Sequence, residues 1–198
     1  MRCDARRGLA VVISGPSGAC KTTIARLLAQ RFGYELSVSA TTRASRAGEQ
    51  DGREYYFMTR KAFALALERD EFLEHSEHFD SLYGTPRAPV ERAVEQGRVI
   101  LLQIDVNGAR QVMEQLTGAY CIFLNAPDME TAEERLRSRR TESEEAIRTR
   151  LQRAEMEMAA GLNYDARVVN DDLERTVSEI HSLIRQQEER QGNGCGPS

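Results

Sequence analysis

Residues 9–22 read LAVVISGPSGACKT, and this stretch decides the fold. Its first five residues are apolar and mostly branched, which is typical of a strand buried on both faces. The glycine-rich segment 15–18 then predicts a loop. Apolar residues at helical spacing from Lys21 to Phe32, followed by Gly33, predict a helix. A strand, a loop and a helix in this order are the opening unit of a parallel α/β sheet.

Residues 15–22 nearly match the phosphate-loop pattern G-x-x-x-x-G-K-[ST]. In such a loop backbone N–H groups surround phosphate oxygens, a lysine reaches the β and γ phosphates, and a hydroxyl holds Mg²⁺. Lys21 and Thr22 supply the last two groups, so we expect ATP as the phosphoryl donor and Mg²⁺ at Thr22. The residues expected to contact ATP here are Gly15, Pro16, Ser17, Gly18, Ala19, Cys20, Lys21, Thr22 and Thr23.

Cys20 departs from the pattern, which has glycine at this position. A side chain there would crowd the phosphate or force an unfavourable backbone angle. The departure bears on activity more than on ancestry. The alternative interpretation of the whole segment is a glycine-rich turn that happens to precede an amphipathic helix.

The rest of the chain continues the α/β alternation around a less regular middle segment. Strands are predicted over residues 37–39, 54–58, 99–104, 120–124 and 168–169. Helices are predicted over residues 59–69 with Thr59 as the N-cap, and over 86–96, 109–116, 128–139, 141–160 and 173–190. Residues 191–198, with three glycines and a proline, are expected to be disordered.

Composition excludes several classes of protein. The formal net charge of −4 argues against a protein built to coat nucleic acid. The apolar run near the start is too short for a membrane span or a secretory signal core. The four cysteines are scattered without metal-ligand spacing and are expected to be reduced thiols. These features predict a cytoplasmic protein with no nucleic-acid or membrane partner.

A second cluster of interest follows the first helix, in residues 39–55. Arg43 and Arg46 are three residues apart and can converge on one phosphate, because each planar guanidinium can donate to two oxygens. A tyrosine hydroxyl, such as that of Tyr55, would complete an anchor for a monophosphate. Taken alone, such charged residues are usually a solvated surface.

Several stretches together resemble guanylate kinases, over almost the whole chain from residue 9 to residue 190. The matching stretches are GPSGACKTT, SVSATTRASRAGEQDGREYYF, EFLEHSEHFDSLYGTPR, VILLQIDVNGA, LRSRRTESEEAIRTRL and VVNDD. The resemblance implies a P-loop kinase fold, with a parallel sheet flanked by helices. It implies a core of residues 1–37, 89–127 and 156–190, a mixed α/β GMP-binding insertion at 38–88, and a helical lid at 128–155.

The resemblance also assigns roles to residues of the acceptor site. It implies that the GMP phosphate is contacted by Ser39, Arg43, Arg46 and Tyr55. It implies that Glu74 and Thr85 read the guanine, with Tyr83 nearby and Asp105 close to the acceptor and the metal. A carboxylate suits guanine, which donates from N1 and from its exocyclic amine. Many family members carry a further acid two residues before Asp105, and here Gln103 takes that position.

On the donor side the resemblance assigns residues 128–155 to a lid whose arginines close on the transferring phosphoryl group. It favours Arg139 and Arg150 with Arg135 behind them, and it places Asn170 on the adenine side. Arg140 replaces the usual glycine after Arg139. Without the resemblance, this arginine- and glutamate-rich stretch would be interpreted as a salt-bridged exposed helix. Catalytic contributions are expected from Lys21, Arg43, Arg139 and Arg150.

The function implied is ATP-dependent phosphorylation of GMP, and of dGMP, to GDP in purine nucleotide metabolism and GMP recycling. The expected partners are the small molecules ATP and GMP, and the chain is expected to be a monomer or a homodimer. Two alternatives remain. One is a non-catalytic guanylate-kinase-like binding module. Cys20 and Gln103 are changes in the direction of such a module. The other is a P-loop kinase acting on another small phosphorylated acceptor, such as a sugar phosphate.

Overall fold

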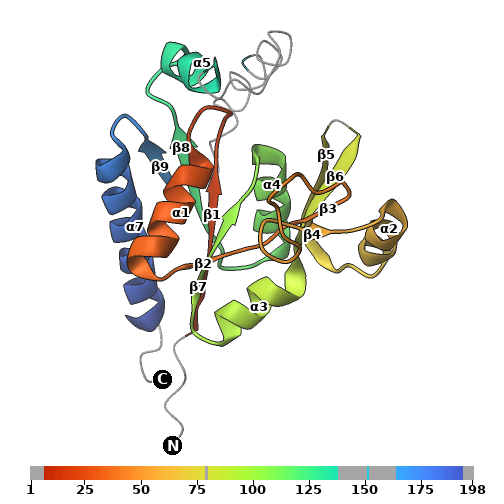
Figure 1. The fold of residues 1–198 in the computed structure, drawn as a ribbon. Helices are drawn as coiled ribbons and strands as arrows, with labels where there is room; N and C mark the ends of the chain where they lie inside the picture. The colour runs from red at the N-terminus through yellow and green to blue at the C-terminus, as the bar shows by residue number, and fades with distance from the viewer. Residues whose placement is uncertain (1–6, 79, 138–150, 152–163, 194–198) are drawn as a thin grey trace, which may run out of the picture.

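The computed structural model describes residues 7–78, 80–137, 151 and 164–193. Its centre is a five-stranded sheet in the order β2-β7-β1-β8-β9, and all its neighbouring strands are parallel (Figure 1). The strands of this sheet are β1 (Leu9–Ser14), β2 (Glu35–Leu36), β7 (Val99–Gln103), β8 (Tyr120–Asn125) and β9 (Ala166–Val169). The buried strand, loop and helix expected from residues 9–32 are confirmed.

Helices cover both faces of this sheet, as an all-parallel sheet requires. Alternate residues of β1 point to opposite faces, so Leu9, Val11 and Ile13 contribute to one core and Ala10 and Val12 to the other. The first core is closed by α1 (Lys21–Phe32) and α7 (Leu173–Asn193). The second is closed by α3 (Arg87–Glu95) and α4 (Val106–Gln115).

A second, four-stranded sheet lies beside the main one, next to α4 (Figure 1). Its order is β4-β3-β6-β5, and β5 and β6 form an antiparallel hairpin. Phe63 of the flanking helix stacks on Phe72 with ring centroids 4.5 Å apart, which anchors that helix to the sheet. The elements of this part are β3 (Ala40–Thr41), β4 (Tyr56–Phe57), α2 (Arg60–Glu68), β5 (Phe72–His78) and β6 (Ser81–Pro86).

Several expected elements need correction. The strand expected over residues 37–39 is wrong, because the chain crosses here from one sheet to the other. Ser37 N–H still donates to Leu101 O at 2.9 Å in the main sheet, whereas Ser39 O accepts from Tyr56 N–H at 2.9 Å in the second. The helix expected from residue 109 begins at Val106, since Asp105 caps it by accepting from Gly108 N–H at 2.7 Å.

The ends of other helices are closer to expectation. The Thr59 cap is confirmed, with its hydroxyl accepting from Ala62 N–H at 3.1 Å. Helix α7 ends at Asn193 and not at Arg190, so the first three residues of the expected disordered tail are helical; helix ends commonly shift by a turn. Helix α5 (Met129–Arg137) follows β8.

Two further expectations concern membranes and thiols. None of the described helices combines the length and the apolarity needed to cross a bilayer. Cys20 and Cys121 are free thiols, while Cys3 and Cys195 lie outside the described residues.

Candidate active site

The loop between β1 and α1 has a backbone path that its glycines make possible. Gly15 has a φ of 144°, and a Cβ atom there would lie 2.0 Å from Leu124 O. Gly18 has a φ of 88°, and a Cβ atom there would lie 2.7 Å from Ala132 O. The loop can therefore pack tightly against its neighbours. It ends at the amino end of α1, where free N–H groups and the helix dipole favour an anion.

Lys21 folds back over this loop. Its ammonium donates to Gly15 O at 2.6 Å and to Pro16 O at 3.0 Å, so the positive charge lies at the loop. Thr22 and Thr23 follow in the first turn of α1, and both are exposed. Mg²⁺ takes few protein ligands and completes its shell with phosphate oxygens and water. The hydroxyl of Thr22 fits that donor chemistry.

Cys20 is in the left-handed conformation, with φ 65° and ψ 28°. This confirms the unfavourable backbone angle expected from the missing glycine. A residue with a Cβ atom costs about 1–2 kcal/mol more than glycine in this region. The thiol lies 3.7 Å from Gly18 O, a weak contact that offsets little of that cost.

Cys20→Gly is expected to raise the free energy of unfolding by up to about 1 kcal/mol. Glycine adopts the left-handed conformation without strain, but it also increases the entropy of the unfolded chain, which offsets part of the gain. The substitution is also expected to strengthen ATP binding, since no side chain remains to crowd a phosphate. Denaturant titration and calorimetric ATP titration measure both. Cys20→Ala is the matched control, because it removes the thiol and keeps the strain. Equal stability and affinity in Cys20→Gly and the wild type would show that the loop tolerates the thiol.

The expected adenine-side residues meet next to this loop. Asn170 follows β9, is 2% exposed, and its amide donates to Ala19 O at 3.1 Å. The Arg135 guanidinium on α5 donates to Asn170 O at 2.9 Å. The phosphate loop, α5 and the end of β9 are therefore joined by direct hydrogen bonds.

In the second sheet, Arg43 is held by an acid that the sequence analysis did not assign. Its guanidinium donates to the two carboxylate oxygens of Glu49 at 2.8 and 3.0 Å. The same carboxylate accepts from the backbone N–H of Arg46 at 2.7 Å. The Arg43 guanidinium, followed by that N–H, lowers the pKa of Glu49, which is thus a stable anion. Glu49 fixes Arg43 and the backbone of Arg46 in one cluster.

Aromatic rings surround Arg43. Its guanidinium carbon lies 5.5 Å from the centroid of the Tyr55 ring and 5.9 Å from that of Phe57, within cation–π range. Tyr55 and Tyr83 meet edge to face with centroids 6.0 Å apart. Burial raises the pKa of Tyr55, so its hydroxyl keeps its proton and can donate to an anion. The carbonyl of Ser39 accepts from the backbone N–H of Tyr56, the residue between Tyr55 and Phe57.

Glu74 is a buried carboxylate in the hairpin, only 5% exposed. Its Oε1 accepts from the Thr85 hydroxyl at 2.6 Å. Burial raises the pKa of Glu74 to about 7, and the negative charge of Asp105 acts in the same direction. The two residues expected to recognise guanine are therefore hydrogen-bonded to each other. With a pKa near neutrality, the Glu74 carboxyl group changes its protonation state around pH 7.

Asp105 caps α4, the helix that packs against β5 of the second sheet. The strand before it, β7, neighbours β1 in parallel, with Gln103 opposite Ile13. The segment after β7 therefore leaves the same edge of the sheet as the phosphate loop, where parallel α/β sheets bind ligands. Asp105 also influences Glu74 electrostatically. The loop expected to bind ATP and the Asp105–Glu74 pair of the expected GMP site thus lie towards the same edge of the main sheet.

Two of the expected lid arginines, Arg139 and Arg150, lie outside the described residues, as do Arg140 and most of the helix expected over 141–160. Of the segment expected to form the lid, the structure describes residues 128–137 and 151, which include α5 and Arg135.

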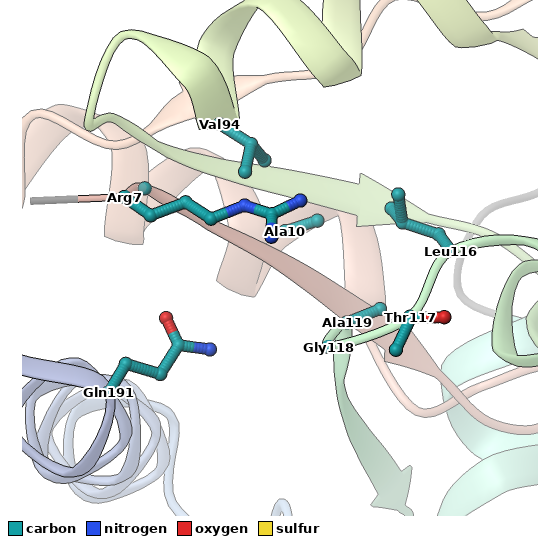
Figure 2. A pocket seen from close by; sticks show the side chains of 9 residues that line it. Arg7, Ala10, Val94, Leu116, Thr117, Gly118, Ala119 and Gln191 are labelled. Carbon is teal, nitrogen blue, oxygen red and sulfur yellow. The ribbon is translucent and has the colours of Figure 1, made fainter. Parts of the chain in front are cut away.

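A separate cavity of about 400 Å³ lies at the opposite edge of the main sheet, beside the amino end of β1. Figure 2 shows Val94, Leu116 and Ala119 on its walls, with Arg7 and Gln191 as its long polar side chains. None of the expected site residues lines it.

Comparison with known proteins identifies the family of this chain. A profile of the family described as guanylate kinase matches residues 7–187. The guanylate kinase of Synechocystis sp. is 44% identical over 183 residues, covering 92% of this chain and 96% of that protein. The guanylate kinase of Parasynechococcus marenigrum is 46% identical over 178 residues, covering 89% and 98%. The crystal structure of guanylate kinase from Anaplasma phagocytophilum matches with a TM-score of 0.75 at 35% identity, covering 92% of this chain and 87% of that one.

These matches extend through the main sheet, the phosphate loop and the second sheet alike. The chain belongs to the guanylate kinase family.

Proposed function

We propose that this protein transfers the γ-phosphoryl group of ATP to GMP, and to dGMP, giving GDP or dGDP and ADP. The observation that carries the proposal is the buried Glu74–Thr85 pair in the second sheet. A carboxylate can accept from guanine N1–H and from the exocyclic amine, whereas adenine offers an acceptor at the corresponding ring nitrogen. A buried site built to pair with a donor rejects a base that lacks it by about 10⁴ or more.

On the donor side, the backbone of residues 15–20 and the amino end of α1 would hold the phosphates of ATP. Lys21 would exchange its carbonyl partners for the β and γ phosphates, and the Thr22 hydroxyl would hold Mg²⁺ together with those phosphates. When bound, the metal neutralises phosphate charge. Arg135 and Asn170 would contact the adenine side, because Arg135 donates to Asn170 and Asn170 donates to Ala19 of the loop.

On the acceptor side, the phosphate of GMP would lie among Ser39, Arg43, Arg46 and Tyr55. Two guanidinium groups supply only donors and a neutral phenol can donate its proton, which suits a phosphate dianion. Glu49 already accepts from the Arg43 guanidinium and from the backbone N–H of Arg46, so the phosphate either displaces its carboxylate or shares Arg43 with it. Asp105 and Tyr83 would line the path between Glu74 and the phosphate cluster.

Phosphoryl transfer requires positioning and charge stabilisation more than a protein nucleophile. The phosphate oxygen of GMP would attack the γ-phosphorus in line, so no covalent enzyme intermediate forms. Lys21 and Arg43, with Arg139 and Arg150 from the lid segment, would take up the negative charge. Closure of the lid segment and of the second sheet over the nucleotides would exclude water and limit wasteful hydrolysis of ATP.

A coupled assay of ADP release with GMP, dGMP, AMP, UMP and a sugar phosphate as acceptors tests the proposal. We expect turnover with the two guanine nucleotides and a rate at least about a thousandfold lower with AMP. Calorimetric binding of GMP without turnover would instead indicate a binding module. Turnover with a sugar phosphate but not with GMP would indicate another acceptor class.

The proposed setting is the cytoplasm, which supplies both nucleotides. The free thiols of Cys20 and Cys121 suit a reducing compartment.

A further inference from the structure

The strand that carries Glu74 lies at the edge of the second sheet, and helix α4 of the main body packs along it. An edge strand presents unpaired backbone N–H and C=O groups. At His75, the residue after Glu74, both groups are taken by one side chain of α4. Gln111 Oε1 accepts from His75 N–H at 3.0 Å, and Gln111 Nε2 donates to His75 O at 2.9 Å. The Gln111 amide therefore acts as one further strand residue beside β5.

One turn earlier in α4, Gly108 lies against the Glu74 carboxylate. A Cβ atom on Gly108 would be 2.6 Å from Glu74 Oε2 and 3.1 Å from its carboxyl carbon. No side chain fits there unless the carboxylate moves. Gly108 has ordinary helical backbone angles. Glycine is therefore needed here because the Glu74 carboxylate lies so close, and not because of the backbone conformation.

Oε1 and Oε2 of Glu74 are thus fixed from two sides. The Thr85 hydroxyl holds Oε1 from within the hairpin, and the bare backbone of Gly108 limits Oε2 from the main body. Gln111 holds the backbone of the next residue. A carboxylate that must face two donors of a base at once needs this kind of fixed position, since specific sites tolerate displacements of only about 0.5 Å.

We propose that Gly108 and Gln111 are positioning residues for guanine recognition, which act through Glu74 and couple the second sheet to the main body. The proposal rests on the proposed function. It predicts that disturbing either residue weakens the binding of GMP and its discrimination from IMP, which lacks the exocyclic amine, and leaves the binding of ATP unchanged.

The test compares Gly108→Ala, Gln111→Ala and Glu114→Ala. Glu114 is the matched control, because it lies on the same helix and its side chain forms an exposed ion pair with Arg110 at 3.3 Å, away from Glu74. We expect KM for GMP to rise about ten- to a hundredfold in the first two variants, with KM for ATP unchanged. We also expect their ratio of kcat/KM for GMP over IMP to fall. Glu114→Ala should match the wild type in all of these.

Stability separates positioning from a structural role. Alanine has a higher helix propensity than glycine, which offsets part of the cost of moving the Glu74 carboxylate, so Gly108→Ala should change Tm little even as KM for GMP rises. A double-mutant cycle with Glu74→Gln adds a second readout. If Gly108 and Gln111 act through Glu74, their effects on GMP shrink in that background.

The possible outcomes are distinct. If the wild type phosphorylates GMP and both variants keep its KM and its GMP-over-IMP ratio, the inference is wrong. Effects that are fully additive with Glu74→Gln would also overturn it. If the wild type fails to phosphorylate GMP at all, the proposed function fails first.

Discussion

Glu74→Gln is expected to lower kcat/KM for GMP by about a thousandfold. The carboxylate offers an acceptor to each of two guanine donors, whereas glutamine offers one acceptor and turns its own NH₂ group towards the second donor. Hydrogen bonds to a charged group contribute about 1.5–3 kcal/mol each, and a loss of about 4 kcal/mol corresponds to about a thousandfold in rate. The effect should fall on GMP, with KM for ATP unchanged.

The same substitution is expected to stabilise the protein at pH 8. Burial raises the pKa of Glu74 from 4.5 to about 7, so between these values the folded state binds a proton that the unfolded state has lost. The contribution of Glu74 to the free energy of unfolding is fully present below pH 4.5 and is lost as the pH rises through 7. The loss amounts to at most about 3 kcal/mol. Glutamine carries no charge to bury. The gain in free energy of unfolding should therefore be about 1–3 kcal/mol at pH 8 and much smaller at pH 5.

Kinetics and calorimetric melting at pH 5 and pH 8 measure both effects. Glu77→Gln is the matched control, because Glu77 lies on the same strand and its side chain is 57% exposed in a surface ion pair with Arg60. We also expect KM for GMP in the wild type to rise as the pH falls below about 7, because the protonated carboxyl is a poorer acceptor, and we expect no such rise in Glu74→Gln. Wild-type GMP kinetics in Glu74→Gln would remove Glu74 from the site.

The sequence predicted the strand, loop and helix of residues 9–32 well because their determinants are local. The apolar run 9–13, the glycines and Lys21 lie within fourteen residues, and each fixes its own backbone or side chain. The expectation that Cys20 would sit at a strained angle followed from one position of one pattern. The Thr59 cap was predictable for the same reason, since capping involves only the next three residues.

The acceptor side was less predictable because its determinants are distant or hidden by burial. The β5–β6 hairpin was missed, since a buried acid at Glu74 breaks the apolar alternation by which strands are identified. Only the family resemblance indicated a role for that residue. The Gln111 contact joins residues 36 positions apart, and no local pattern carries it. Glu49 lies in the cluster of residues 39–55, but the sequence alone does not indicate which arginine a surface acid will pair with.

The second large effect is expected for Lys21→Met, which should lower kcat by about a thousandfold or more while the fold persists. Removing a single preorganised group that stabilises developing charge costs about 10²–10³ in kcat, and a cation on a transferring phosphoryl group is worth up to about 10⁵. Lys21 has the geometry for this role, because its ammonium already lies on the carbonyl oxygens of Gly15 and Pro16. Methionine keeps the length of the side chain without its charge.

Single-turnover rates with saturating GMP, and melting curves for both proteins, measure the effect of Lys21→Met. The chain offers an exact control in Lys61→Met, since Lys61 is its other lysine and lies exposed on α2. Both variants lose one positive charge, so any difference in kcat or Tm between them is due to the position of the lysine and not to the net charge. A kcat for Lys21→Met within a few-fold of that for Lys61→Met would mean that the loop binds phosphate through its backbone alone and that the charge of the transition state is stabilised elsewhere.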